Sequence, residues 1–385
     1  MRILHTSDWH AGRVWKGIDR LPELAAVFES LGDFIEHGAI DFVLMSGDVF
    51  DSGVPSAEAE RLVFGFLKRI GRTGTRTIVI AGNHDHPARL DAWGMLAELV
   101  NVHVVGRPRR AEAGGVIEVE GRGGERAVVA CVPFARARGF VSALELAAGD
   151  AEARQRYAES LKAVVEHLAE RFRPDTVNLL VAHTHLDGAV LSGSERQVHI
   201  GEEWAAAAQA LPSHAHYVAL GHIHKPQRLE NAPAPTCYAG SPLQLDFGEA
   251  GEEKSFVIVD ARPRQPARIE RVPYHGGTPL TIVRASLADL EQGAEQLRER
   301  GWLRVVVPRT ARDPDINSKV RRLLPNAVSV SVELPEVEEK GATVSVKELR
   351  PSDLYCAYPR SEHGSEPDAA LIDAFGRLWS EAEGS

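Results

Sequence analysis

Five short polar motifs, far apart in the chain, carry the side chains best suited to chemistry. They read Asp8-Trp9-His10, Gly47-Asp48-Val49-Phe50-Asp51, Gly82-Asn83-His84-Asp85, Ala182-His183-Thr184-His185 and Gly221-His222-Ile223-His224. Their aspartate, asparagine and histidine side chains are oxygen and nitrogen donors, a combination that suits manganese, iron or zinc pairs better than magnesium. Together the motifs supply seven ligand-type side chains, which are enough to hold two metal ions.

A single residue of this kind after a strand is usually a helix cap or a hydrogen-bonded loop residue. The set of five is different, because a glycine that allows close backbone approach precedes the polar group in three motifs, at Gly47, Gly82 and Gly221. Two ions that share a carboxylate would bind a phosphate between them and activate water for attack. The motifs therefore predict a catalytic site for phosphoester hydrolysis.

Each motif follows an apolar run, so each ligand group is expected at the end of a strand, where α/β proteins place their chemistry. The first half of the chain alternates strand-like and helix-like segments, which indicates a layered sheet with helices outside it. The predicted strands are 2–6, 42–46, 77–81, 102–105, 116–119, 127–133, 177–182, 217–220, 236–239 and 256–259, and the predicted helices are 21–37, 57–70 and 151–171. Residues 1–275 are therefore expected to form one four-layered α/β domain.

The residues after about 275 are predicted to form two smaller parts. His275-Gly276-Gly277-Thr278-Pro279 is typical of a linker. A small α+β domain is predicted over 278–346, from a strand, helix, strand, helix, strand order at 280–285, 287–300, 303–308, 316–324 and 327–334. The last part, 350–385, holds two amphipathic helix candidates on either side of His363-Gly364-Ser365, and the second has an apolar stripe of Leu371, Phe375, Leu378 and Trp379.

The composition is that of an ordinary soluble protein. Of its 385 residues 44% are hydrophobic, and its three cysteines form no CxxC pair, which argues against a disulfide framework or a zinc finger. The first residues carry no apolar signal region, and no stretch approaches the roughly 18 apolar residues of a spanning helix. We therefore expect a cytoplasmic protein without a membrane segment.

The formal net charge of −10 argues weakly against a nucleic-acid partner, because phosphate binding depends on lysine and arginine. Arginines nevertheless cluster at Arg107, Arg109 and Arg110, at Arg136 and Arg138, and at Arg262 and Arg264. Most such clusters form a solvated rim. A basic path over an acidic protein stays open as an alternative.

The motifs D-x-H, G-D-x-x-D, G-N-H-D, a histidine after a strand and G-H-x-H resemble those of the calcineurin-like metallophosphoesterases. Residues 4–10, 46–51 and 81–85 are similar to the SbcD family of that group. These are bacterial nuclease subunits that work with the ATPase SbcC and are related to the eukaryotic double-strand-break repair nuclease. The resemblance is strong from residue 1 to about 260 and looser beyond. It implies a four-layer α/β/β/α metallophosphoesterase sandwich with a small α+β capping domain and C-terminal helices.

The resemblance also implies which side chains hold metal. One ion would be bound by Asp8, His10, Asp48 and His224, and the other by Asp48, Asn83, His183 and His222, so that Asp48 bridges the two. His84 matches the family histidine that contacts the scissile phosphate and stabilises or protonates the leaving oxygen, and the alternative is a residue that orients a ligand. Asp51 departs from relatives that carry a histidine there, so we interpret it as a carboxylate that orients a ligand or caps its loop.

Other polar residues near the motifs are given lesser roles. His5 and Asp85 are expected to hold ligands in their working orientation. His185 flanks the ligand of the fourth motif. A place beside the metal site and a purely structural role are equally open for it. His214 and His216 precede a strand at the end opposite the fifth motif, so they are expected to be structural.

The activity implied by the resemblance is that of a metal-dependent DNA nuclease that hydrolyses phosphodiester bonds with two divalent metal ions, in the first place Mn²⁺. It would act as an exonuclease on duplex ends and as an endonuclease on single strands and hairpins, together with an SbcC-type ATPase, in double-strand-break repair and recombination. C-terminal helices within 350–385 would bind that ATPase. Helices at 57–70 and 90–100 would form a homodimer, and hence a heterotetramer with the ATPase, although their apolar residues could equally belong to the core.

Two other functions are kept as alternatives. Cyclic-nucleotide phosphodiesterases and protein phosphatases share the chemistry. Such phosphatases carry G-D-x-x-D-R-G and G-N-H-E, whereas here Ser52-Gly53 follows Asp51 and Asp85 follows His84, and a compact phosphodiesterase has little use for the residues after 275. An adaptor that only positions DNA ends for a motor is disfavoured by the complete ligand set.

Overall fold

The computed structural model describes residues 1–135, 150–195, 206–308, 315–333, 355 and 368–383. The chain divides into two compact units, Met1–Glu333 and Leu334–Ser385. Within the described part of the first unit, two six-stranded sheets carry the polar motifs and a three-stranded sheet follows them.

The first six-stranded sheet is built mainly from the N-terminal part of the chain. Its order is β14 (Gln265–Pro273), β13 (Ser255–Arg262), β1 (Arg2–Thr6), β4 (Phe42–Met45), β5 (Arg76–Ile80) and β6 (Val102–Val105). Strands β1, β4, β5 and β6 run parallel, and they alternate along the chain with α1 (Leu21–His37), α2 (Ala57–Arg72) and α3 (Pro87–Ala97). Parallel neighbours need such crossover helices. The predicted alternation is confirmed.

The second six-stranded sheet follows in the chain. Its order is β11 (Gln227–Arg228), β12 (Thr236–Tyr238), β10 (Tyr217–Gly221), β9 (Val177–His183), β8 (Arg126–Val132) and β7 (Val116–Glu120). The four strands β12, β10, β9 and β8 are parallel. The helix α5 (Asp150–Ala169) precedes β9 and packs on this sheet through Leu161, Val165 and Leu168.

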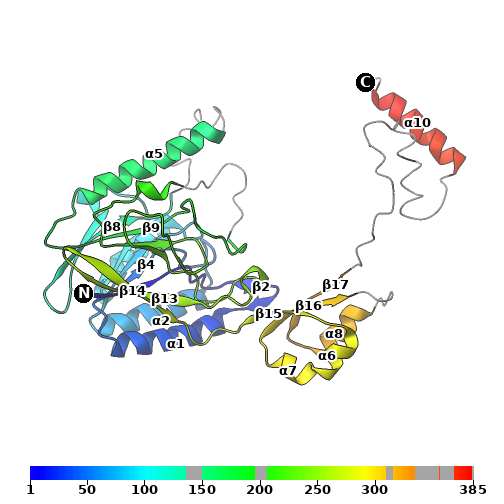
Figure 1. Cartoon of the computed structure of the whole chain (residues 1–385), viewed down its shortest axis with the longest axis horizontal. Helices are drawn as coiled ribbons and strands as arrows, with labels where there is room; N and C mark the ends of the chain where they lie inside the picture. Colours follow the sequence, from blue (N-terminus) through cyan, green and yellow to red (C-terminus); the bar gives the residue numbers. More distant parts are fainter. Residues whose placement is uncertain (136–149, 196–205, 309–314, 334–354, 356–367, 384–385) are drawn as a thin grey trace. The chain divides into compact units, whose positions relative to one another are not determined.

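Alternate residues of the strands face opposite sides of each sheet. One side of each sheet packs against the other sheet and the opposite side packs against helices, which gives four layers. In the first sheet Leu4 packs with the apolar side chains of α1 and α2, whereas its neighbour Ile3 faces the second sheet. In the second sheet Val181 faces the first, and Leu180 packs with α5. Figure 1 shows the order, with α5 at the top and α1 and α2 at the bottom. The predicted α/β/β/α sandwich is confirmed.

The central strands of each sheet end at the same level, and the polar motifs follow these ends. Parallel pairing places Thr6 beside Met45 in the first sheet and His183 beside Gly221 in the second. Three motifs follow β1, β4 and β5, and the other two begin in the last residues of β9 and β10. The fold thus gathers five loops that are distant in sequence.

Residues 280–333 form a small parallel sheet with helices. Its strands are β15 (Leu280–Arg284), β16 (Trp302–Pro308) and β17 (Ala327–Glu333), and its helices are α6 (Leu287–Gln292), α7 (Ala294–Arg298) and α8 (Ile316–Leu323). The predicted single helix over 287–300 is wrong, because the chain breaks at Gly293 between α6 and α7. Glycine lowers helix propensity by about 1 kcal/mol relative to alanine, which makes this the weakest point of the segment.

Glu23 on α1 links the small sheet to the sandwich. Its carboxylate accepts the backbone N–H of Thr278 at 2.8 Å and the indole N–H of Trp302 at 3.1 Å. The buried Arg20 donates to the same carboxylate at 2.7 Å. One charged side chain therefore connects the linker, the small sheet and α1.

The second unit contains α10 (Ala369–Glu383), which confirms the second C-terminal helix candidate. Leu371, Leu378 and Trp379 on this helix are 55%, 66% and 43% exposed, while Phe375 stacks on Tyr355 with ring centroids 4.4 Å apart. The following lie outside the described residues: the first helix candidate apart from Tyr355, other parts of the predicted 350–385 segment, residues 334–346, and Arg136 and Arg138. None of the described helices combines the length and apolar character that crossing a membrane requires.

Candidate metal centre

The loops after β1 and β10 bring together the first set of donors. The ligand atoms of Asp8, His10 and His224 all lie within 4.8 Å of one another. Nε2 of His10 is 3.1 Å from Nε2 of His224. Two imidazole nitrogens that approach this closely, beside a carboxylate, can both bind a single cation.

A second set surrounds the amide of Asn83, in the loop after β5. Its Oδ1 lies 2.9 Å from Nε2 of His183 and 3.1 Å from Nδ1 of His222. Both histidines are buried. Oxygen and nitrogen donors converge here from three different loops, as a second metal position requires.

Asp48 lies between the two sets. Its Oδ2 is 3.7 Å from Nε2 of His10 and 3.5 Å from Nε2 of His183. Its Oδ1 accepts the backbone N–H of His84 at 2.8 Å. One buried carboxylate therefore borders both sets of donors, which is the position of a bridging ligand. The structure brings all seven predicted ligand side chains together.

The backbone is strained at four of these seven residues. Asp8, His10, Asp48 and His222 have φ angles of 50°, 45°, 54° and 98°, and they make up half of the eight described non-glycine residues with positive φ. Such a conformation costs of order 1–3 kcal/mol per residue and persists where the surroundings hold it. At His222 the backbone N–H donates to Asp8 Oδ1 at 3.0 Å. Backbone strain that is concentrated at the candidate metal-binding residues indicates a functional site.

Two glycines of the motifs are required by close packing. A Cβ atom at Gly47 would overlap Nδ1 of His183, and a Cβ at Gly82 would overlap both Oδ1 and the backbone nitrogen of Asp48. The prediction that these glycines allow close backbone approach is confirmed. Glycine is needed here for space, so that the side chains of neighbouring loops can reach one centre.

Hydrogen bonds orient the imidazoles through the nitrogen that faces away from the centre. Nδ1 of His183 donates to the Ser46 carbonyl at 2.8 Å, which leaves the Nε2 lone pair for the site. Nδ1 of His10 lies 3.2 Å from Oδ1 of Asp51. Asp51 thus orients a predicted ligand, as interpreted from the sequence. Such partners fix the tautomer and direction of metal-binding histidines.

Burial makes a cation favourable at this centre. Burial raises the pKa of Asp8 to about 8, against the attraction of His224. Burial lowers the pKa of His10 to about 4, so its imidazole stays neutral and able to bind metal. Burial also opposes the ionisation of Asp48, but the nearby histidines, His183 first, outweigh it and hold the pKa of Asp48 well below its usual value. A divalent cation would offset the cost of the buried carboxylates, so the donor set fits one.

His84 stands beside the first set of donors. Its Nδ1 donates to the carbonyl of Asp51 at 2.8 Å, and its ring meets that of His10 edge-on with centroids 4.6 Å apart. The other ring nitrogen, Nε2, is the atom that can contact a substrate.

His5 and Asp85 act on the backbone that carries the ligands. Asp85 accepts the backbone N–H groups of Val49, Phe50 and Gly82 at 3.1, 3.0 and 2.9 Å, which ties the second motif to the third. His5 is hydrogen-bonded to Ser46 Oγ at 2.9 Å and to Tyr217 at 2.8 Å. Asp85 and His5 therefore hold the candidate ligands in place indirectly. Asp85 acts through the backbone, and His5 acts through neighbouring hydroxyl groups.

His185, for which the sequence left two roles open, and the pair His214 and His216 lie in different places. The ring of His185 lies 6.2 Å from that of His222, beside the site. His214 packs edge-on against Phe172, and Nδ1 of His216 accepts the backbone N–H of Asn178 at 2.9 Å. The structural role predicted for His214 and His216 is confirmed.

Two residues of the described arginine clusters, Arg109 and Arg264, have local partners. Arg109 pairs with Asp91 at 2.8 Å. Arg264 follows β13, and its backbone N–H donates to His216 at 3.1 Å, at the end of β10 away from the motifs. Neither residue supports a basic path into the site.

Sequence reasoning missed a group of residues behind His224. The hydroxyl of Ser194 is 2.6 Å from Nδ1 of His224 and also bonds to the buried Glu249, whose other oxygen is 2.5 Å from Nζ of Lys254. Glu195 accepts the backbone N–H of His224 at 3.1 Å. These residues belong to no motif and come from loops and a three-residue helix, so periodicity and spacing gave no signal for them.

Comparison with known proteins agrees with this geometry. Residues 1–226 match the calcineurin-like phosphoesterase family, and residues 277–359 match the family described as type 5 capsule protein repressor C-terminal domain. The SbcD subunit of the nuclease SbcCD from Bacillus subtilis strain 168 is 33% identical over 100% of this chain and 99% of its own length. Its counterpart from Escherichia coli strain K12 is 30% identical over 84% of this chain and 82% of its own length. The chain therefore belongs to the calcineurin-like phosphoesterases, hydrolases that use divalent metal ions, and within them to the family of SbcD nuclease subunits.

Proposed function

We propose that this protein is a DNA nuclease that hydrolyses phosphodiester bonds by a two-metal mechanism. The observation that carries the proposal is the place of Asp48, whose Oδ2 lies 3.7 Å from His10 and 3.5 Å from His183. Two ions that share this carboxylate would stand close enough to hold one phosphate between them.

We assign one of the two sets of donors to each metal ion. The first ion would be held by Asp8, His10, Asp48 and His224, and the second by Asp48, Asn83, His183 and His222. When bound, such a pair of ions lowers the pKa of water and offsets the charge that develops on the phosphoryl group. Imidazole, carboxylate and amide donors together suit Mn²⁺, which we propose as the working ion.

His84 is assigned to catalysis. Because Nδ1 donates to the Asp51 carbonyl, Nε2 is directed to the substrate side. When both ring nitrogens carry a proton, Nε2 would donate a hydrogen bond to the scissile phosphate or a proton to the leaving oxygen. The Asp51 carbonyl and the packing of His10 fix the ring in this orientation.

The proposed substrates are duplex DNA ends, cut exonucleolytically, and single strands and hairpins, cut endonucleolytically. The test is degradation of end-labelled duplex and hairpin DNA by the purified protein with Mn²⁺, with a cyclic nucleotide and a phosphopeptide as competing substrates. We expect DNA to be cut, the other two to be turned over poorly, and His84→Ala to lose activity while keeping both metal ions. Undiminished cutting by His84→Ala, or preference for the small substrates, would refute the proposal.

We infer that the protein works with an SbcC-type ATPase in double-strand-break repair and recombination in the cytoplasm. The relatives are named as subunits of SbcCD, and α10 supports a helical contact because Leu371, Leu378 and Trp379 are exposed on it. An amphipathic helix of this kind binds a hydrophobic groove or a helical partner. Removing residues 350–385 is expected to abolish ATPase binding in a pull-down and to spare basal Mn²⁺-dependent cutting.

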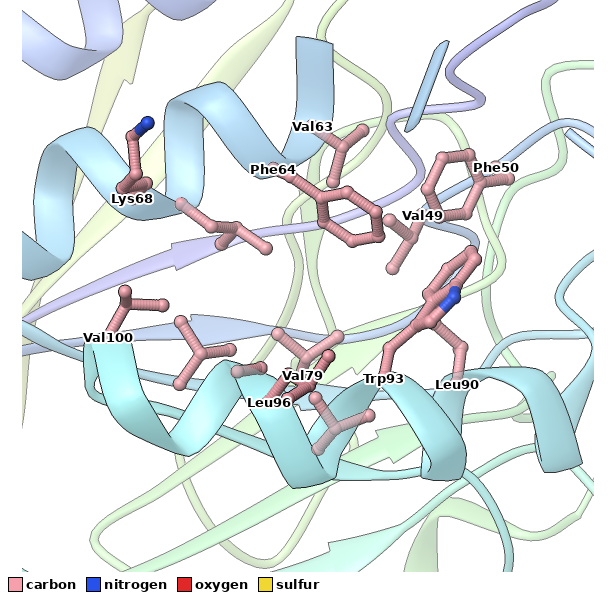
Figure 2. Close-up of a pocket in the computed structure, with 14 residues that line it drawn as sticks. Val49, Phe50, Val63, Phe64, Lys68, Val79, Leu90, Trp93, Leu96 and Val100 are labelled. Atoms are coloured by element: carbon pink, nitrogen blue, oxygen red, sulfur yellow. The ribbon is translucent and has the colours of Figure 1, made fainter. Parts of the chain in front are cut away.

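A homodimer is proposed at an apolar groove between α2 and α3. Figure 2 shows Phe64 of α2 and Trp93 of α3 facing each other, with Val49 and Phe50 of the second motif at one end. The groove encloses about 260 Å³. Leu96 lines the groove and is 73% exposed, and Met95 and Leu99, close to it in the chain, are 79% and 82% exposed. A contiguous apolar patch of this kind marks an interaction site, and a second copy would cover it symmetrically. With two ATPase subunits the assembly would be a heterotetramer.

A further inference from the structure

His224 differs from the other site histidines in what holds its outer nitrogen. Nε2 faces His10 at 3.1 Å, and Nδ1 lies 2.6 Å from the hydroxyl of Ser194. That hydroxyl is hydrogen-bonded in turn to Glu249, whose Oε1 is itself 3.5 Å from Nδ1 of His224. A carboxylate thus stands directly behind the ring.

Glu249 is fully buried, at 0% exposure, in the short helix η5 (Phe247–Glu249). A buried carboxylate is costly unless hydrogen bonds and an opposite charge compensate it. Its Oε2 accepts the backbone N–H of Leu245 at 3.0 Å and pairs with Nζ of Lys254 at 2.5 Å. These partners occupy Oε2, which leaves Oε1 for Ser194 and the ring of His224.

The loop that carries Ser194 is fixed on both sides. The Glu195 carboxylate accepts the backbone N–H groups of Ser192 and Gly193 at 3.0 and 2.8 Å and that of His224 at 3.1 Å. On the other side a Cβ at Gly248 would overlap the carbonyl of Ser192, so this loop lies directly against η5. The hydroxyl of Ser194 is therefore held between the two groups that it joins.

We propose that Glu249 is a positioning residue for the metal-binding side chain of His224, acting through Ser194. The inference rests on the proposed function, because it takes His224 to be a ligand of the first ion. Glu249 accepts a hydrogen bond from the hydroxyl of Ser194, and the oxygen of that hydroxyl accepts a hydrogen bond from Nδ1–H of His224. These two bonds fix the ring plane so that Nε2 points at the cation position. Carboxylate partners of this kind orient metal-binding histidines and raise their basicity.

The test is titration of Mn²⁺ into the metal-free full chain by calorimetry, with melting temperatures measured in parallel. The unaltered protein is expected to bind two ions. In Glu249→Gln one of the two sites is expected to weaken about 10–100-fold while the other keeps its affinity, and Ser194→Ala should weaken the same site. Glu252→Gln is the matched control, since Glu252 Oε2 also bonds Lys254, at 3.0 Å, but stands outside the chain of groups that joins Glu249 to His224. It should bind both ions normally.

A double variant, Glu249→Gln with Lys254→Met, removes the buried ammonium, which in Glu249→Gln alone would keep only one carboxylate partner, Glu252. It is expected to recover melting temperature and to keep the weakened site. Equal affinities in Glu249→Gln and the unaltered protein would overturn the positioning role and leave the proposed function standing. A second result would also overturn the positioning role: both sites weaken equally in Glu249→Gln, and the double variant restores their affinities. That result would show that Glu249 acts in folding only. If the unaltered protein binds no Mn²⁺, the metal assignment itself fails and this inference with it.

Discussion

Oδ1 of Asp51 lies 3.2 Å from Nδ1 of His10 and 3.0 Å from a guanidinium nitrogen of Arg13. Burial disfavours ionisation of Asp51, but the hydrogen bond from His10 and the charge of Arg13 outweigh it and lower its pKa to about 2. The carboxylate is therefore anionic at neutral pH. It can hold the His10 ring with Nε2 directed toward Asp48.

Replacing Asp51 should weaken metal binding through His10. Asp51→Ala removes the partner of Nδ1 and frees the ring to rotate, so we expect Mn²⁺ affinity at one site to fall about 10–100-fold. Arg13→Gln is the control, because the Arg13 side chain bonds Asp51 but is not itself a predicted ligand. Calorimetric titration of both variants measures the difference. Equal affinities in Asp51→Ala and the unaltered protein would refute the role.

A methyl group at Gly82 should disrupt the centre. In Gly82→Ala the added Cβ overlaps Oδ1 and the backbone nitrogen of Asp48, so the third motif must move away from the second. We expect loss of Mn²⁺ binding and of cutting, and a loss of stability of about 1–3 kcal/mol from overpacking. Gly65→Ala in the exposed face of α2 is the matched change, since its Cβ meets no atom within 4 Å. It should raise helix stability slightly. Normal metal binding by Gly82→Ala would contradict the packing argument.

The candidate ligands could be located in the sequence because each ends or follows a strand with a clear apolar pattern. Asp48 follows the fully buried β4, and the pattern of α1 is so regular that its predicted bounds agree with Leu21–His37. The strand β14 was missed because it is an edge strand with mostly exposed residues, in which the apolar alternation is limited to Ala267 and Ile269. Glu249 was missed for a different reason. It lies in a three-residue helix, and its partner Ser194 is brought near only by the tertiary fold.

Acid should destabilise the fold through His5. Burial lowers the pKa of His5 to about 3, below its unfolded value of 6.5. Between these pH values the unfolded chain binds the extra proton, so stability is present above pH 6.5 and is lost as pH falls toward 3. One such proton corresponds to a slope of about 1.4 kcal/mol per pH unit. Urea unfolding of metal-free protein from pH 7 to 4 should therefore show a smaller slope in His5→Gln. Parallel curves for the two proteins would rule the contribution out.

Glu23 should control the attachment of the small sheet. Glu23→Ala removes the acceptor of Thr278 and Trp302 and leaves the buried Arg20 without its carboxylate. Because Glu23 is only partly buried, breaking this pair should cost less than the about 3–5 kcal/mol of a fully buried one. We expect protease cleavage within 275–279 to become several-fold faster, as followed by mass spectrometry. Glu29→Ala on the same helix is the control, because Glu29 is exposed and pairs with Arg69 of α2, away from the small sheet. Identical cleavage rates in Glu23→Ala and Glu29→Ala would disprove the attachment.

The groove between α2 and α3 yields the sharpest test of the proposed homodimer. Leu96 and Leu99 are 73% and 82% exposed, and burying each against a second copy would contribute about 1.5–3 kcal/mol. Leu96→Asp would instead place a charge in that contact, so the dimer should weaken at least about 100-fold, since each 1.4 kcal/mol is a factor of ten. Ile282→Asp is the control, because Ile282 is 50% exposed in β15 and does not line the groove. Sedimentation equilibrium should give two chains per particle for the unaltered protein and for Ile282→Asp, and one for Leu96→Asp. A dimer that survives Leu96→Asp and Leu99→Asp together would place the interface elsewhere on the molecule.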